Sequence, residues 1–167
     1  MRIVVIGAGT VGTWVADLLC RQRHSVTVVD SDVEQVRRIN AELDVKAIHG
    51  SGSESTVLFQ SGVSTCDICL AVSGVDEVNL VGASMAKAMG ARRSVARVYG
   101  RVFHDLSTFD YQRHFRVDRL LSLEHLSAME LARSIRNPGS VTLENFARGQ
   151  LEVQAMEIRD QPAAVGQ

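Results

Sequence analysis

The sequence predicts an α/β domain in which helices cover both faces of a parallel sheet of about six strands. Short apolar runs alternate with helical stretches along residues 1–135. Most of these runs are continuously apolar, which is typical of strands that are buried on both faces. A glycine-rich turn directly follows the first run and opens the first helix. Together these features predict a doubly wound sheet with the strand order 3-2-1-4-5-6.

The first half of the chain supplies three strands and three helices of this pattern. The predicted strands span 2–6, 26–29 and 46–49. A helix is expected over 11–19, where apolar residues recur at helical spacing, and a second helix follows with Ser31 or Asp32 as its N-cap. The segment 50–53, which is rich in glycine and serine, breaks the chain before a short helix around 57–58.

The second half continues the alternation and then departs from it. Its predicted strands span 68–72, 95–98 and 117–121, and its predicted helices span 76–89, 102–111 and 123–135. The Asn-Pro-Gly segment 137–139 ends the last helix, and 150–159 is predicted to be a strand outside the alternating unit. We therefore expect one domain over 1–137, followed over 138–167 by a linker and a strand that is either appended to this domain or the start of a second one.

Composition narrows the classes of function. The formal net charge is −1 and both signs are mixed along the chain, so no long-range field favours nucleic acid as a partner. The three cysteines lie in apolar segments, as is typical of a protein in a reducing cytoplasm. Cys66 and Cys69 have C-x-x-C spacing, but alternation along a strand is expected to place their thiols on opposite faces. No apolar run approaches the roughly 20 residues of a membrane helix, so direct membrane insertion is not expected.

The turn Gly7-Ala8-Gly9-Thr10-Val11-Gly12 carries the chemistry of the predicted site. Its pattern, G-x-G-x-x-G, lies between a predicted strand and a predicted helix, which is the context of the Rossmann dinucleotide-binding fingerprint. Gly7 permits a tight turn, Gly9 leaves room for a pyrophosphate, and Gly12 allows the helix to pack closely on the strand. The first free N–H groups of the helix, near Thr10 and Val11, are expected to face the phosphates.

An acidic residue at the end of the second strand completes the fingerprint. Asp30 follows Gly12 by 18 residues. Its carboxylate is expected to accept hydrogen bonds from the adenosine ribose hydroxyls and to repel a 2′-phosphate. The residues therefore favour NAD over NADP.

With these residues in place, the chain from Met1 to about Ile135 resembles the regulatory nucleotide-binding domains of bacterial Trk-type potassium uptake systems, the RCK/KTN family. The resemblance rests on short segments in a fixed order, at 1–12, 28–30, 49–50, 70–73, 76–79, 95–98 and 123–126. It implies a ligand-operated switch rather than an enzyme: a nucleotide binds, paired domains shift, and a membrane-embedded potassium transporter subunit senses the shift. It further implies a homodimer or a higher ring that lies in the cytoplasm at the inner face of the membrane.

The resemblance also implies a role for particular positions. They are, in chain order, Gly7, Gly9, Thr10, Val11 and Gly12 at the phosphates, Asp30 and Ser31 at the ribose, Gly50 and Ser51 at the adenine edge, Ser73 and Gly74 at the nicotinamide-side sugar, and Arg97 as a source of positive charge. The resemblance places Glu124 near a dimer or cation-binding region of some relatives, while the helix dipole offers a structural reason for an acid at that position.

The choice of ligand and of function class leaves alternatives open. Relatives that respond to ATP often carry arginine after the second glycine, where this chain has Thr10, and this favours NAD(H) over ATP, ADP or AMP. The alternative to a regulatory domain is a fragment of an NAD-dependent oxidoreductase that uses the same cleft for hydride transfer. Such an enzyme would normally need a substrate domain with an acid or base.

Overall fold

The structure, a computed structural model, describes residues 1–136, 140–146 and 151–156. The chain divides into two units, Met1–Leu123 and Glu124–Gln167. The sequence instead places the domain boundary at 137, after the helix that follows the last strand of the sheet. Each unit is described by itself.

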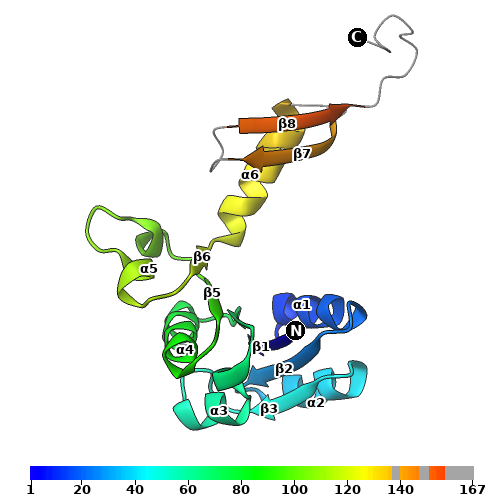
Figure 1. The fold of residues 1–167 in the computed structure, drawn as a ribbon, viewed down its shortest axis with the longest axis vertical. Helices are drawn as coiled ribbons and strands as arrows, with labels where there is room; N and C mark the ends of the chain where they lie inside the picture. Colours follow the sequence, from blue (N-terminus) through cyan, green and yellow to red (C-terminus); the bar gives the residue numbers. More distant parts are fainter. Residues whose placement is uncertain (137–139, 147–150, 157–167) are drawn as a thin grey trace, which may run out of the picture. The chain divides into compact units, whose positions relative to one another are not determined.

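The first unit is built on a six-stranded parallel sheet with the order β3-β2-β1-β4-β5-β6 (Figure 1). Its strands are β1 (Arg2–Ile6), β2 (Ser25–Asp30), β3 (Lys46–His49), β4 (Ile68–Ala71), β5 (Arg93–Arg97) and β6 (Arg119–Leu121). Ile6 at the end of β1 pairs with Val29 of β2 and with Ala71 of β4. The strand order therefore reverses at β1, and the predicted order is confirmed. Because the three strands end level with one another, the loops that follow them meet at one edge of the sheet.

Helices cover both faces of this sheet. They are α1 (Thr10–Arg21) and α2 (Val33–Glu42) on one face, and α3 (Ser55–Gln60) and α4 (Asp76–Met89) on the other. Adjacent residues of β1 point to opposite sides, so Val5 packs with Ala16 of α1 while Val4 packs with Ala83 of α4. The predicted helix over 76–89 has these same bounds, and the predicted Asp32 cap of α2 is present, since its carboxylate accepts the Glu34 N–H at 2.8 Å.

The helix predicted over 102–111 is wrong. The chain instead forms the short 3₁₀ helix η2 (Arg101–His104) and, after a turn, the short helix α5 (Tyr111–His114). Two aspartates explain the break. Asp105 accepts the Ser107 N–H at 2.9 Å, and Asp110 caps α5 by accepting the Arg113 N–H at 2.9 Å. Such local bonds compete with the ladder of a continuous helix.

The second unit contains one helix and a hairpin within the described residues. The helix α6 (Leu123–Arg136) begins at the last residue of the first unit, and β7 (Ser140–Phe146) pairs antiparallel with β8 (Leu151–Met156). The strand predicted over 150–159 is confirmed at 151–156, and its ends lie outside the described residues, as does the helix stop at 137–139. The strand β7 was not predicted, because its alternation is limited to Val141 and Leu143 before Glu144-Asn145.

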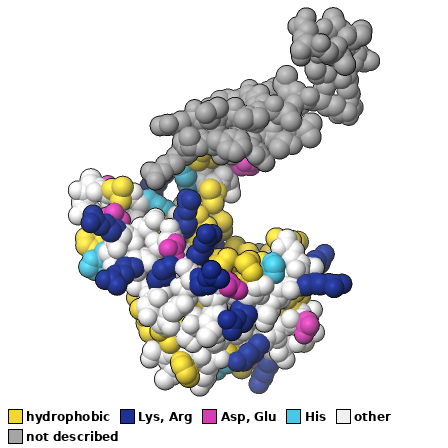
Figure 2. All heavy atoms as spheres, viewed as in Figure 1, with side chains coloured by type: hydrophobic (Ala, Val, Ile, Leu, Met, Phe, Trp, Pro, Cys, Tyr) yellow, Lys and Arg dark blue, Asp and Glu magenta, His cyan; other side chains and the backbone are white. Residues whose placement is uncertain are grey.

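Two surface properties bear on function. Figure 2 shows basic side chains spread over the face of the first unit, with acidic and apolar side chains among them. The surface of this unit therefore offers no uniform charge that would attract an anion from a distance. None of the helices in the described ranges is long and apolar enough to cross a bilayer.

Cys66 and Cys69 lie in the same hydrophobic core cluster, so the expectation that their thiols face opposite sides of the sheet is wrong. Cys66 precedes β4 and belongs to the turn after the 3₁₀ helix Val63–Thr65, where strand alternation does not apply. Both side chains are buried, and burial raises the pKa of each thiol. The thiolate, which is the reactive form, is therefore disfavoured at both positions.

We predict that a thiol reagent such as Ellman's reagent will modify Cys20, which is partly exposed, well before the other two cysteines. Native protein at pH 8 should release one equivalent of chromophore, and denatured protein should release three, one for each cysteine in the sequence. Rapid reaction of all three thiols in the native state would contradict the buried positions of Cys66 and Cys69.

Candidate functional site

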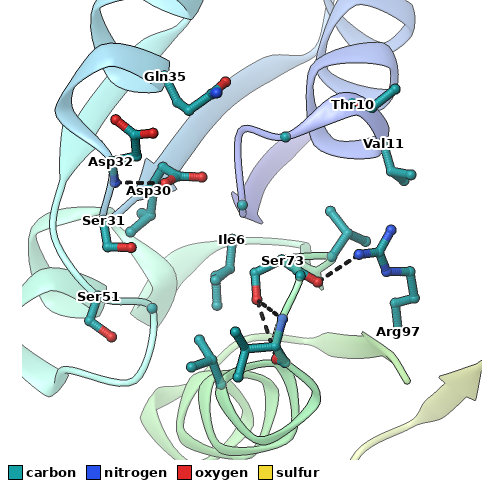
Figure 3. A pocket seen from close by; sticks show the side chains of 18 of the residues that line it. Ile6, Thr10, Val11, Asp30, Ser31, Asp32, Gln35, Ser51, Ser73 and Arg97 are labelled. Carbon is teal, nitrogen blue, oxygen red and sulfur yellow. Dashed lines mark hydrogen bonds between the residues drawn. The ribbon is translucent and has the colours of Figure 1, made fainter. Parts of the chain in front are cut away.

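The candidate site is a pocket of about 430 Å³ at the edge of the sheet where the strand order reverses (Figure 3). The loops after β1, β2, β3, β4 and β5 all contribute to it. Its lining residues are Ile6, Gly7, Gly9, Thr10, Val11, Val29, Asp30, Ser31, Asp32, Gln35, Ser51, Gly52, Val72, Ser73, Gly74, Val75, Val78, Arg97 and Tyr99.

The three glycines of the first turn have different surroundings. Gly7 has φ +105°, and a Cβ there would lie 2.7 Å from the Ser73 backbone. A Cβ on Gly12 would lie 1.8 Å from the carbonyl oxygen of Gly7, so this glycine is required for the close packing of α1. A Cβ on Gly9 would meet nothing within 4 Å. Gly9 therefore leaves space on the pocket side, whereas Gly7 and Gly12 allow the protein to pack against itself.

The N-terminus of α1 faces this space. Gly9 is the N-cap residue, and its carbonyl accepts the first helical bond, from Thr13 N–H at 2.9 Å. The N–H groups of the first helical turn precede this bond and have no acceptor within the helix. Together with the helix dipole, they form an attractive site for an anion at Thr10 and Val11.

Asp30 connects two of the loops that form the pocket. Its Oδ2 accepts the N–H of Ala8 in the glycine turn at 2.5 Å, and its Oδ1 accepts the N–H of Asp32 at 2.8 Å. The side chain is half-buried and lines the pocket. A carboxylate has about four acceptor positions, so these two bonds leave capacity for ligand hydroxyl groups. Asp30 thus holds the glycine turn in place and presents a negative charge to the pocket.

Asn79 organises the opposite wall from a fully buried position on α4. Its Oδ1 accepts the N–H and the hydroxyl of Ser73, both at 2.8 Å, and its Nδ2 donates to the carbonyls of Ser73 and Arg97, both at 2.9 Å. Every polar atom of the amide is therefore used within the protein. The result is a rigid link between the loop after β4 and the end of β5.

Arg97 brings a buried positive charge to the same wall. Its side chain donates to the Ser73 carbonyl at 2.7 Å, and the residue is 5% exposed. Its Nε atom is buried without a hydrogen-bond partner, and no carboxylate pairs with the guanidinium among the residues that the structure describes. A buried charge without an anionic partner is costly, so an acceptor or anion from a ligand would stabilise it.

Most of the predicted positions meet in this pocket. They are Gly7, Gly9, Thr10, Val11, Asp30, Ser31, Ser51, Ser73, Gly74 and Arg97. Gly12 and Gly50 are not among the lining residues. Gly12 packs beneath the turn, and Gly50, with φ +153°, lies against the Val57 side chain, which a Cβ would approach to 2.6 Å.

Other residues of the site were not predicted from the sequence. Gln35 lies on α2 beyond the Asp32 cap, and its Oε1 is buried without a partner. Tyr99 lies two residues after Arg97, just beyond the end of a strand. This position is the sequence feature that could have indicated a role in the site. Glu124 lies in the first turn of α6, and no group of three or more potential metal ligands occurs within the described ranges.

The solved structures that share this fold include several nucleotide-binding domains. The TrkA-N domain of the inner membrane protein YbaL from Escherichia coli has a TM-score of 0.70 and 13% identity, and the match covers 79% of this chain and 94% of that chain. The GsuK channel bound to NAD has a TM-score of 0.67 and 18% identity, over 87% of this chain and 25% of that chain. At these identities the likeness shows the shared fold.

Sequence comparison gives closer relatives. The chain is 30% identical over 168 residues to the Trk system potassium uptake protein TrkA of Halomonas elongata, and 35% identical over 166 residues to a TrkA homolog of Archaeoglobus fulgidus. These matches cover 100% and 99% of this chain but 37% of each relative, so the chain spans little more than a third of their length. A family model described as the TrkA-N domain matches residues 3–108, and the chain therefore belongs to the TrkA-N domain family.

Proposed function

We propose that the pocket binds NAD(H) and that the domain regulates a potassium transporter or channel in response. The observation that carries the proposal is the joint position of the glycine turn, the N-terminus of α1 and the Asp30 carboxylate around one pocket. These groups complement the phosphates and the ribose of an adenosine diphosphate.

The proposed ligand lies extended across the strand ends. Its diphosphate rests on Gly9, Thr10 and Val11, while its adenosine ribose contacts Asp30 and Ser31 and its adenine lies toward Ser51. The second ribose then lies near Ser73 and Gly74, on the wall that contains Arg97. The buried guanidinium contributes positive charge at this end, whereas Thr10, at the diphosphate, carries no charge. Gly12 and Gly50 support this arrangement from outside the pocket.

Adenine nucleotides share the ADP portion of this ligand. Structural neighbours include the GsuK channel bound to NAD, GsuK bound to ADP, and the Kef C-terminal domain of Shewanella denitrificans in an AMP-bound form. ADP, ATP and AMP are therefore competing ligands. The Asp30 carboxylate disfavours NADP, because it would face the extra 2′-phosphate.

The proposed output is a change in assembly geometry rather than chemistry. The names of the relatives connect the family to potassium uptake, and the GsuK neighbours are channel proteins. We infer a homodimer or ring of these domains at the cytoplasmic face of the membrane, bound to a membrane-embedded potassium transporter subunit. A nucleotide shifts such an assembly only if it binds its two geometries with different affinities.

A panel of nucleotides tests the proposal by thermal shift and native mass. We predict that NAD and NADH at 100 times their Kd will raise the melting temperature by about 5–10 °C, and that NADP will have a much smaller effect. The oligomeric mass is measured with each ligand. A protein that none of the nucleotides stabilises would contradict the binding site, and steady oxidation of NADH with a small carbonyl compound would favour the oxidoreductase alternative.

A further inference from the structure

The two ends of the pocket differ in chemistry (Figure 3). The end toward β2 and β3 is mostly polar: apart from that of Val29, its side chains are those of Asp30, Ser31, Asp32, Gln35 and Ser51. The end toward β4 and β5 is largely apolar. Its side chains, apart from those of Ser73 and Arg97, are those of Val11, Val72, Val75, Val78 and Tyr99. A ligand that fills the pocket should therefore carry a flat, largely apolar group at the second end.

Tyr99 is held at this end by its backbone. The carboxylate of Asp76, the first residue of α4, accepts the Tyr99 N–H at 2.9 and 3.0 Å and the Gly100 N–H at 2.8 Å. The bonds come from main-chain groups, so they do not depend on the side chain at position 99. The position of the Tyr99 backbone relative to the pocket is thus set by α4 and β5.

The ring of Tyr99 also contacts the side chain of Arg97. Its centroid lies 4.4 Å from the guanidinium carbon of Arg97, a cation–π arrangement. Arg97 is itself immobilised by burial and by its bond to the Ser73 carbonyl. Tyr99 remains 45% exposed. One face of the aromatic ring is therefore packed on a fixed cation, while the residue lines the pocket and remains partly exposed.

We propose that Tyr99 is a stacking platform for the second heteroaromatic ring of a dinucleotide, and that it determines selectivity for dinucleotides over mononucleotides. The proposal rests on the proposed function, because Asp30 then assigns the adenosine half to the polar end. The ring beyond the diphosphate reaches the apolar end, where Tyr99 offers a π-face. Planar heterocycles stack on such faces with little dependence on their hydrogen-bonding groups.

The test compares NAD with two ligands that lack the second ring. NAD carries nicotinamide, whereas ADP-ribose ends at the second ribose, and AMP ends before it. We predict that Tyr99→Ala will weaken NAD binding by roughly 5- to 100-fold in isothermal titration calorimetry, and that it will change ADP-ribose and AMP binding by less than about twofold. Tyr99→Phe keeps the ring and should bind NAD as the wild type does, while Tyr99→Leu should resemble Tyr99→Ala.

Control variants separate stacking from effects on the fold. Phe59→Ala removes another exposed aromatic side chain, 68% exposed on α3 and outside the pocket lining, and should change no affinity. Melting temperatures establish that each variant is folded. An equal loss of NAD and ADP-ribose binding in Tyr99→Ala, or no loss of either, would overturn the role of Tyr99 while leaving the nucleotide site in place. If the wild type bound none of these ligands, the proposed function would fail with it.

Discussion

Gly9→Ala is expected to weaken NAD binding by at least about tenfold, or 1.4 kcal/mol, while the melting temperature stays close to that of the wild type. A Cβ on Gly9 meets no protein atom within 4 Å, and its φ of −67° suits alanine. The added methyl group therefore costs the fold little. Gly9 lines the pocket at the N-terminus of α1, where the diphosphate is proposed to approach the backbone, so an added methyl group is expected to obstruct that approach.

Gly12→Ala is the matched variant, and its expected effect is on stability. Its Cβ would lie 1.8 Å from the Gly7 carbonyl oxygen and 2.8 Å from the Gly7 carbonyl carbon, so the helix must move away from the strand. We expect a loss of about 3 kcal/mol in the free energy of unfolding, measured by urea denaturation. If Gly9→Ala bound NAD normally, the diphosphate would have to lie elsewhere; if Gly12→Ala were fully stable, the close packing of α1 would not matter.

The parts of the fold that were predictable are those whose signals are local. The alternation of strands and helices, the glycine turn and the helix 76–89 each follow from a pattern within a few turns of chain. The break between η2 and α5 depends on whether Asp105 and Asp110 bond to nearby backbone rather than to solvent, which periodicity does not report. The hairpin strand β7 owes its strand conformation to pairing with β8, and its own alternation is short.

The residues of the candidate site also differ in whether a local sequence pattern predicts them. Gly9 and Asp30 were predictable because the fingerprint has a fixed spacing. Asn79 and Tyr99 were not, because their roles arise from contacts between α4 and the end of β5, made by residues 18 to 24 positions apart. Asn79 in particular resembles an ordinary helix residue until its four bonds to Ser73 and Arg97 are known.

Asp30→Ala should reduce NAD affinity by roughly 10- to 100-fold, because hydrogen bonds to a charged group contribute about 1.5–3 kcal/mol. Besides the lost ribose contacts, the structure gives a second reason for a lower NAD affinity. The carboxylate also accepts the N–H groups of Ala8 and Asp32, and Ala8 is fully buried, so the substitution leaves its N–H without this acceptor. A lower affinity alone would therefore not show that Asp30 touches the ligand.

The ratio of NAD to NADP affinity separates the two causes. If Asp30 only holds the glycine turn, Asp30→Ala weakens both dinucleotides by the same factor and leaves their ratio unchanged. If the carboxylate faces the ribose, its removal costs NAD two hydroxyl contacts and relieves NADP of repulsion at the 2′-phosphate, so the preference for NAD falls by at least about tenfold. Asp17→Ala, which breaks the ion pair with Arg21 on α1 outside the pocket lining, is the matched control and should move neither affinity. A ratio that stayed constant in Asp30→Ala would confine Asp30 to a structural role, and the discrimination against NADP would then need another source.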